Sequence, residues 1–217
     1  MADLSLLTYF LQKLPRSLSA LLPAAEAQPA AVTWQDFTPP ELACTLGRCA
    51  DGLPVLLDLG SPAAGALLIC ADPRSGKTAL MQAMLGSLVQ DNPAQMVQYL
   101  VISPQPRQWQ SRTLTGGADG QALGIFSPRD AAALDWLEQL VEEMEHRFAV
   151  SCDRPAVLIL IDGLDALLQS SSALRASLEA LILNGPQVGL WPVCSLETSA
   201  ALRQSRILRL FGAILAG

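Results

Sequence analysis

At 217 residues, the chain has room for one large domain, or for one domain and a small appendage. Hydrophobic residues make up 51% of it and charged residues 16%, which excludes a disordered protein and favours a core with much buried sheet. A net charge of −6 argues against a broad DNA-binding face, although a local basic strip is compatible with it.

The N-terminal segment is predicted to be an appendage to the main domain. Leucines recur at helical spacing between residues 4 and 14, and Pro15 is expected to break or kink that helix. Residues 23–31 are rich in alanine and proline and predict a linker. We therefore expect a helix and linker over residues 1–34, packed on the domain or on a neighbouring subunit. A single domain is expected over residues 35–217.

The sequence gives no sign of export or stable membrane insertion. No apolar run approaches the roughly 18–20 residues of a membrane span, and the start lacks the basic region of a secretory signal. Lys13 and Arg16 are the only basic residues of the leucine-rich segment, which gives little support to a membrane-surface helix. The five cysteines form no C-x-x-C pair, and their odd number favours a reducing compartment. These features predict a cytoplasmic protein.

From about residue 40, short apolar runs alternate with helical stretches. This alternation is typical of βαβ units and predicts an α/β domain, with a mainly parallel sheet and helices on both faces. The run Val157–Ile161 is apolar throughout, as expected of a strand covered on both faces. The predicted strands are 54–59, 66–71, 97–103, 122–126, 156–162, 190–195 and 207–215. The predicted helices are 77–90, 128–149, 172–184 and 198–204.

The predicted helix 128–149 has the clearest pattern. Ser127 is expected to cap it, Pro128 suits its first position, and Asp130 completes a capping box. One apolar stripe is expected to face the core, while the glutamates off the stripe face solvent. The stripe consists of Leu134, Leu137, Val141, Met144 and Phe148, and the glutamates are Glu138, Glu142 and Glu145.

Residues 71–78 form a candidate phosphate-binding loop, because they read Ala-Asp-Pro-Arg-Ser-Gly-Lys-Thr between an apolar strand and a helix. The backbone N–H groups of such a loop surround phosphate oxygens, and Gly76 lets the backbone approach closely. Lys77 is expected to reach the β- and γ-phosphates of ATP, and the Thr78 hydroxyl to join the Mg²⁺ shell. The pattern has glycine where this chain has Ala71. A plain strand–turn–helix with an exposed lysine is the alternative.

The apolar run that ends at Asp162 fits a Walker B strand, whose carboxylate holds Mg²⁺ through water. Alternatively, Asp162 only caps the strand end. We expect strands 66–71 and 156–162 to be parallel neighbours, or one strand apart, with Lys77 and Asp162 at the same sheet edge. The expected metal-binding residues are Thr78 and Asp162. The expected nucleotide-binding residues are Pro73, Arg74, Ser75, Gly76, Lys77, Thr78 and Asp162.

With these motifs in place, the chain resembles the FtsK/SpoIIIE group of DNA-pumping ATPases, within the HerA/FtsK superfamily, from about residue 35 to residue 215. Residues 54–59 look like the strand before the P-loop in that family, and residues 98–104 like its next strand. Residues 143–148, Glu-Met-Glu-His-Arg-Phe, closely match the family's helix end Glu-Met-Glu-Arg-Arg-Tyr. The resemblance implies a RecA-like P-loop NTPase fold, hexameric rings with ATP between subunits, and translocation of double-stranded DNA. The type VII secretion ATPases are relatives that move protein.

The sequence departs from the active pattern of that family after Asp162. A glutamate that polarises the attacking water usually follows the Walker B aspartate, and here that position is Gly163. Asp165 is a candidate substitute base, or else it caps the following helix. The strand that usually ends Ala-Thr-Gln-Arg-Pro reads Val-Cys-Ser-Leu-Glu-Thr over residues 193–198, so Leu196 stands where a sensor glutamine would contact the γ-phosphate. Gly163→Glu is expected to raise hydrolysis if the remaining geometry is intact and subunits can assemble.

Three functions are compatible with these residues. The departures favour a degenerate module that binds ATP and Mg²⁺, hydrolyses ATP weakly or not at all, and assembles into a larger machine as part of a homo- or hetero-oligomeric ring. The alternative is an active motor subunit that moves double-stranded DNA or protein. A P-loop kinase is less well supported, because the chain has no recognisable acceptor site or lid and the glycine-rich segment 116–120 is typical of a surface turn.

Overall fold

A computed structural model of the chain describes residues 42–48, 54–110, 120–150, 154–170, 172–201 and 205–217. All of them belong to the unit Pro39–Gly217. The described strands are β1 (Ala43–Arg48), β2 (Pro54–Asp58), β3 (Leu67–Ala71), β4 (Val97–Ile102), β5 (Ala122–Phe126), β6 (Ala156–Ile161), β7 (Leu190–Glu197) and β8 (Ala213–Ala216). The described helices are α2 (Lys77–Asp91), α4 (Ala131–Ala149), α5 (Leu164–Ser170), α6 (Ser172–Asn184), α7 (Thr198–Ala201) and α8 (Ser205–Leu208), with the short 3-10 helices η3 (Pro62–Ala64), η4 (Pro106–Trp109) and η5 (Gly185–Val188).

Several predictions concern residues outside this description. The N-terminal helix, the linker and the domain boundary at residues 34 and 35 fall there, as does nearly all of the glycine-rich segment 116–120. The same is true of residues 202–204 at the end of the predicted helix 198–204. These stay predictions.

Six of the described strands form one sheet, in the order β5-β4-β6-β7-β3-β8, and every pair of neighbours is parallel. Every residue of β6 is buried, as its unbroken apolar sequence predicts for a strand covered on both faces. β3 and β6 are separated by β7 alone, so the predicted relation between the P-loop strand and the Walker B strand is confirmed. The predicted α/β class with a mainly parallel sheet is also confirmed.

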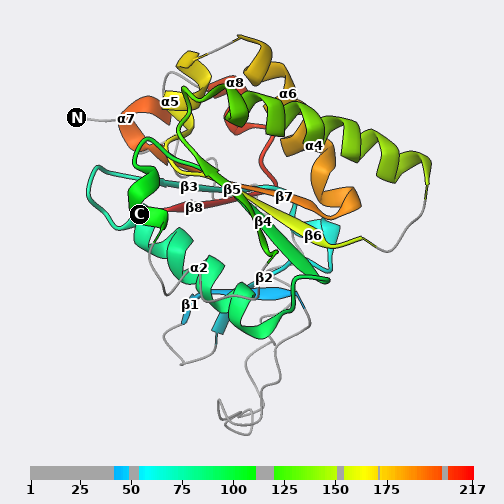
Figure 1. Cartoon of the computed structure of the whole chain (residues 1–217). Helices are drawn as coiled ribbons and strands as arrows, with labels where there is room; N and C mark the ends of the chain where they lie inside the picture. Colours follow the sequence, from blue (N-terminus) through cyan, green and yellow to red (C-terminus); the bar gives the residue numbers. More distant parts are fainter. Residues whose placement is uncertain (1–41, 49–53, 111–119, 151–153, 171, 202–204) are drawn as a thin grey trace, which may run out of the picture. The chain divides into compact units, whose positions relative to one another are not determined.

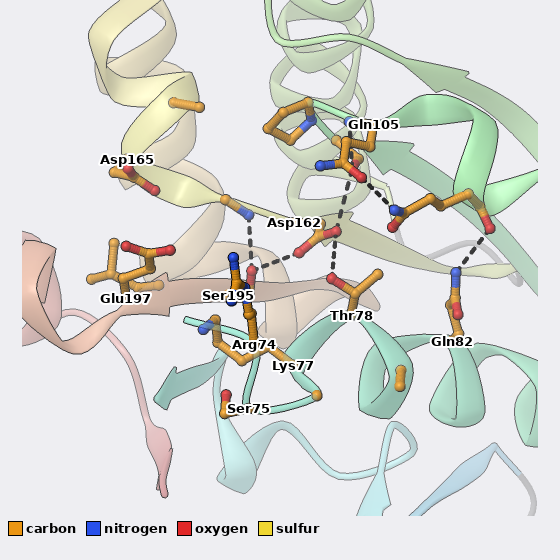
Figure 2. Close-up of a pocket in the computed structure, with 18 residues that line it drawn as sticks. Arg74, Ser75, Lys77, Thr78, Gln82, Gln105, Asp162, Asp165, Ser195 and Glu197 are labelled. Carbon is orange, nitrogen blue, oxygen red and sulfur yellow. Dashed lines mark hydrogen bonds between the residues drawn. The ribbon is translucent and has the colours of Figure 1, made fainter. Parts of the chain in front are cut away.

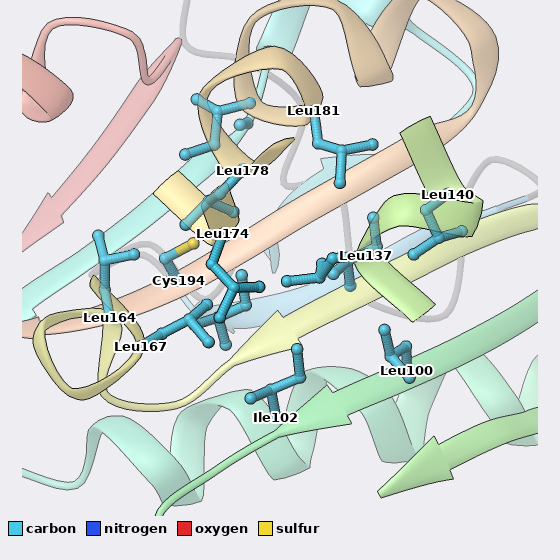
Figure 3. Close-up of a cluster of buried hydrophobic side chains, with 14 of the residues drawn as sticks. Leu100, Ile102, Leu137, Leu140, Leu164, Leu167, Leu174, Leu178, Leu181 and Cys194 are labelled. Atoms are coloured by element: carbon cyan, nitrogen blue, oxygen red, sulfur yellow. The ribbon is translucent and has the colours of Figure 1, made fainter. Parts of the chain in front are cut away.

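Helices cover both faces of this sheet, and Figure 1 shows α2 on one side and α4 with α6 on the other. Alternate residues of each strand therefore belong to two separate cores. On β6, Leu158 and Leu160 pack in the core under α2, while Ile159 and Ile161 pack in the core under α4, α5 and α6. Figure 3 shows the second core, in which leucines of α4, α5 and α6 meet the apolar side chains of the strands.

The predicted strand 54–59 lies outside the parallel sheet. It corresponds to β2, which pairs with β1 in an antiparallel two-stranded sheet. Cys44 of β1 is fully buried in the core on the α2 side, and the backbone N–H of Thr45 donates a 3.2 Å hydrogen bond to Ser87 Oγ of α2. The β1–β2 pair is therefore attached to the domain through α2. β1 was not predicted, because its sequence Ala-Cys-Thr-Leu-Gly-Arg has only a short apolar pattern.

The start predicted for the helix 128–149 was wrong by three residues. α4 begins at Ala131 with Asp130 as its N-cap, and no side-chain bond caps it. Ser127 and Asp130 instead close a turn before the helix, in which Ser127 N–H donates to Asp130 Oδ2 at 2.7 Å and Asp130 N–H donates to the Ser127 carbonyl at 3.0 Å. Pro128 occupies the second position of that turn, for which its fixed φ angle is well suited.

The apolar stripe predicted on this helix was right in part. The buried positions are Ala133, Leu137, Leu140 and Met144. Leu134 and Val141 lie at the edge of this face and are only partly buried, and Phe148 is 52% exposed, so its assignment to the core was wrong. The glutamates Glu138, Glu142 and Glu145 are exposed, as predicted.

Two further elements differ from the prediction, at residues 205–216 and at α5. The predicted strand 207–215 is divided between α8 and β8, because a short apolar run does not distinguish helix from strand by its periodicity. Gly212 lies between them, where an added Cβ would come within 2.5 Å of the Ala64 carbonyl oxygen, so only glycine fits. The short helix α5 begins directly after Gly163 and was not among the predicted helices; Asp165 lies within its first turn and does not precede the helix as a cap.

Leu137→Ala is expected to lower the free energy of unfolding by about 2–5 kcal/mol, because Leu137 is fully buried in the core between α4 and the sheet. Urea unfolding followed by circular dichroism measures this change. Glu138→Ala is the matched control on the next, exposed position and is expected to change stability by about 0.5 kcal/mol or less. Equal losses in the two variants would contradict the position assigned to α4.

Candidate functional site

The loop between β3 and α2 has the backbone shape of an anion-binding turn. Ser75 N–H donates to the Asp72 carbonyl at 3.3 Å, and Leu80 N–H donates to the Gly76 carbonyl at 2.9 Å in the first turn of α2. Arg74 and Gly76 both have left-handed backbone angles, with φ of 64° and 90°. Left-handed residues in such a turn bring successive N–H groups to one side, which is typical of anion-binding nests. The predicted strand–loop–helix setting of residues 71–78 is thus present.

Ala71 is compatible with this loop although the motif has glycine there. It is the last residue of β3, is buried, and pairs with Glu197 of β7. Its φ angle is not positive, since Leu42 and Arg74 are the only described non-glycine residues with that property. An alanine at this position therefore introduces no backbone strain.

The Lys77 ammonium is held over the loop by two backbone carbonyls. Its Nζ lies 2.9 Å from the Ala71 oxygen and 2.7 Å from the Asp72 oxygen. An ammonium group has three N–H donors. One donor of Lys77 therefore remains for a ligand, and the position of the charge is fixed before any ligand arrives.

Sheet register brings three polar residues into one row. Ile102, Ile161 and Cys194 are paired across β4, β6 and β7. The next residue of each strand is Ser103, Asp162 and Ser195, respectively, and the strand alternation places all three side chains on the α2 side of the sheet. The parallel pairing of β4, β6 and β7 therefore brings these three polar side chains together.

The Asp162 carboxylate accepts hydrogen bonds from hydroxyl groups of three different elements, as Figure 2 shows. Thr78 Oγ1 of α2 donates to Oδ2 at 3.0 Å, and Ser103 Oγ donates to the same oxygen at 3.3 Å. Ser195 Oγ donates to Oδ1 at 2.8 Å and itself accepts the backbone N–H of Gly163 at 2.8 Å. Asp162 thus lies beside the P-loop helix, as predicted.

These groups line a cavity of about 650 Å³ at the carboxyl ends of the strands. Its lining includes Arg74, Ser75, Gly76, Lys77, Thr78, Asp162 and Asp165 of the predicted site residues. Pro73 is not among the lining residues; it is exposed within the loop. The cavity also has a carboxylate that the sequence interpretation missed, Glu197 at the end of β7. Ligands of open parallel sheets bind at this edge.

The oxygen donors of the cavity fit Mg²⁺. A hydroxyl and a carboxylate, Thr78 and Asp162, are the hard ligands that this ion prefers, and it usually keeps several waters and binds substrate phosphates. In the part of the chain that the structure describes, no three His, Cys, Asp or Glu side chains are grouped as a complete metal cage. The donor set therefore suits an ion that arrives with a phosphate ligand.

Gly163 has a backbone conformation that disfavours the missing glutamate. Its φ is +90°, and an added Cβ would lie 3.3 Å from Pro104 Cγ. Its N–H is bonded to Ser195 Oγ. A glutamate at this position would have a strained backbone, and the expected effect of Gly163→Glu on hydrolysis stays a prediction.

The polar group that β7 contributes next to Asp162 is Ser195 rather than residue 196. Leu196 is fully buried, in the core on the α4–α6 side of the sheet. Ser195 and Glu197 alternate with it and belong to the other face, which is the face of α2. The alternation of side chains along residues 193–197 is the feature of the sequence from which Ser195 could have been identified.

Residues 143–148, which match the family's helix end, do not line the cavity and have a structural role. Glu143 accepts from Arg147 Nε at 2.7 Å and from Arg154 at 2.5 Å, while Arg147 also donates to the Val188 carbonyl at 3.0 Å. Burial acts to raise the pKa of Glu143, but the hydrogen bonds and charges of the two arginines outweigh it and lower that pKa. This cluster joins the end of α4 to the turn before β7.

The sequence profile of the FtsK/SpoIIIE family matches residues 27–154, which is more than half of the chain. The chain belongs to the FtsK/SpoIIIE family. Membership of this family implies that the P-loop binds nucleotide. Comparison with curated proteins finds no match.

Solved structures with the same fold include the following three. ATPases 2 and 3 of Thermomonospora curvata EccC, in complex with a signal sequence peptide, are 19% identical with a TM-score of 0.61 over 78% of this chain and 32% of that one. ATPases 2 and 3 of EssC from Geobacillus thermodenitrificans are 15% identical, with a TM-score of 0.60 over 90% of this chain and 39% of that one. The pCW3 conjugation coupling protein TcpA, in monomer form with ATPgS, is 13% identical, with a TM-score of 0.63 over 83% of this chain and 55% of that one.

These likenesses establish a RecA-like P-loop ATPase fold for this chain. The chain spans between about a third and just over half of the length of these three proteins. Among the described residues, no helix is both long enough and apolar enough to cross a membrane.

Gly163→Ala is expected to lower the free energy of unfolding by about 1–2 kcal/mol, because an L side chain is disfavoured at its left-handed φ angle. Chemical denaturation gives the value. Gly86→Ala in α2 is the control: Gly86 has a helical setting with free space for a Cβ, and the change is expected to stabilise the protein by about 0.5–1 kcal/mol. A neutral or stabilising Gly163→Ala would contradict the strain assigned to a side chain at this position.

Proposed function

We propose that this chain is an ATP-binding FtsK/SpoIIIE-like domain that hydrolyses ATP weakly or not at all and serves as an assembly module of a larger machine. The observation that carries the proposal is the pairing of a preformed phosphate site with a glycine at the catalytic position. Lys77, Thr78 and Asp162 are already in place. Gly163 has no side chain to polarise water, and its conformation disfavours one.

Binding of ATP would rely on the loop and on Lys77. The N–H groups of residues 74–78 would surround the phosphates at the N-terminus of α2, and the free donor of Lys77 would bond a phosphate oxygen. The Thr78 O–H is donated to Asp162, which leaves the lone pairs of Thr78 Oγ1 for Mg²⁺. Thr78 and Asp162 would hold Mg²⁺, which would neutralise phosphate charge when bound.

Weak hydrolysis follows from the absence of a positioned base after Asp162. A general base contributes about 10²–10⁴-fold to such a rate. Asp165 lines the cavity from the first turn of α5, but it lies on a shorter side chain two residues beyond the usual position. Glu197 lies far from the P-loop in sequence, but strand pairing places it opposite Ala71 at the start of the loop.

An active motor subunit is the alternative, and the two carboxylates Asp165 and Glu197 in the cavity support it. Either one would act as the base if it came within hydrogen-bond reach of the attacking water. The polymer moved would be double-stranded DNA or a protein. The net charge of −6 favours protein, because a DNA-binding face is usually basic.

The named relatives support a place in a transport machine. TcpA is a conjugation coupling protein, and EccC was solved with a signal sequence peptide. We infer that this chain joins other copies or related subunits in a ring, with residues 35–217 as the ATPase domain and residues 1–34 as a helix and linker. A cytoplasmic position is part of the same proposal, supported by the cytoplasmic domain of Thermomonospora curvata EccC, which is 19% identical with a TM-score of 0.60 over 91% of this chain.

ATP or ADP with Mg²⁺ is expected to raise the melting temperature of the full chain. At 100 times the Kd, simple linkage gives about 2.7 kcal/mol of stabilisation, or roughly 5–10 °C for a protein of this size. Lys77→Ala is expected to abolish the shift, because the loop loses its fixed positive charge. Arg175→Ala, an exposed cation on α6, is the control and should keep the full shift. Absence of any shift in the parent protein at millimolar nucleotide would overturn the proposed function.

ATP hydrolysis by the parent protein is expected to be very slow or undetectable in a phosphate-release assay, because Gly163 supplies no base. Rapid release that Lys77→Ala abolishes would contradict this and favour the motor. In that event Asp165→Asn and Glu197→Gln identify the base, since the variant that lacks it would lose about 10²–10⁴-fold in rate while the other stays near the parent rate.

A further inference from the structure

Ser195 is a buried hydroxyl with two well-defined partners at the centre of the cavity edge. It is 1% exposed. Its Oγ accepts the Gly163 N–H at 2.8 Å and donates to Asp162 Oδ1 at 2.8 Å. A serine hydroxyl has a single O–H donor, so the direction of this bond is fixed by the carboxylate, which only accepts.

The two oxygens of Asp162 are held in different ways. Oδ2 accepts from both Thr78 and Ser103, at 3.0 Å and 3.3 Å. For Oδ1, the hydrogen-bond partner in the described residues is Ser195. Removal of the Ser195 hydroxyl would leave Oδ2 with two donors and Oδ1 with none, so the carboxylate would be less tightly held against rotation about its Cβ–Cγ bond.

Ser195 also holds the backbone that follows Asp162. The Gly163 N–H is bonded to Ser195 Oγ, and Gly163 has the positive φ that turns the chain from β6 into α5. One hydroxyl therefore fixes both the side chain of Asp162 and the peptide after it. The position of the carboxylate relative to Thr78 depends on both.

We propose that Ser195 is the positioning residue that makes nucleotide binding by this site depend on Mg²⁺, through the orientation of the Asp162 carboxylate. This inference rests on the proposed function. Three of the roughly four lone-pair positions of the carboxylate are occupied by hydroxyl donors, which leaves Asp162 to accept from a water of the ion rather than to surround the ion itself. Groups that orient a metal-binding side chain typically change metal affinity by about 10–100-fold when they are removed.

The test compares ADP and ATP affinities of the full chain in excess Mg²⁺ and in EDTA, by calorimetry. Ser195→Ala is expected to lower the affinity measured in Mg²⁺ by about 10-fold or more and to leave the affinity in EDTA near that of the parent, because the P-loop and Lys77 are untouched. Ser195→Thr keeps the hydroxyl and is expected to restore the Mg²⁺ effect. Melting temperatures without nucleotide show whether each variant folds.

Ser87→Ala is the matched control for a purely structural effect. Ser87 Oγ also accepts a backbone N–H, from Thr45, and donates to a backbone oxygen, of Met84 at 2.9 Å, but it has no bond to Asp162. Its loss is expected to lower the melting temperature and to leave the ratio of the affinities with and without Mg²⁺ as in the parent.

The outcomes separate the inference from the proposed function. A parent protein that binds no nucleotide overturns both. A parent that binds nucleotide without any gain from Mg²⁺ overturns the inference and leaves nucleotide binding in place. Equal losses in Mg²⁺ and in EDTA for Ser195→Ala, or an unchanged Mg²⁺ gain in that variant, also overturn the inference alone.

Discussion

The parallel register of β4, β6 and β7 is the constraint on which the rest of the site depends. Pairing of Ile102, Ile161 and Cys194 places the next residue of each strand in one row, and the middle one is Asp162. A shift of one residue in any of these strands would turn its polar side chain to the other face. The apolar residues that fill both cores therefore also determine where the carboxylate lies relative to the P-loop.

The same row explains why the position after Asp162 is a glycine. The chain must turn from β6 into α5 within two residues, beside Pro104, and it does so with a positive φ at Gly163. The Gly163 N–H is directed to Ser195, so the peptide belongs to the network that orients Asp162. The glycine at position 163 is thus tied to local backbone geometry, which disfavours any larger side chain there.

Much of the fold could be predicted because the parallel strands are short apolar runs separated by helices and turns. The P-loop helix and the relation of β3 to β6 followed from motifs with fixed local geometry. The antiparallel β1–β2 pair and the split of residues 207–215 could not, since both depend on packing against distant elements. At the site, Thr78 and Asp162 were found by motif, but Ser195 was missed, because its role arises from pairing of β6 with β7 rather than from its own neighbours in sequence.

The Asp162 network is complete without a ligand, and this bears on how the site would use one. Hydroxyl groups of Thr78, Ser103 and Ser195 donate to the Asp162 carboxylate, and two backbone carbonyls accept from the Lys77 ammonium. Both charged groups therefore have hydrogen-bond partners before a nucleotide binds. A site that is ordered in advance binds without the cost of ordering its side chains. Nucleotide would then stabilise the fold through linkage without a rearrangement of these side chains, which suits a module whose shape in a larger assembly persists whether ATP is bound or absent.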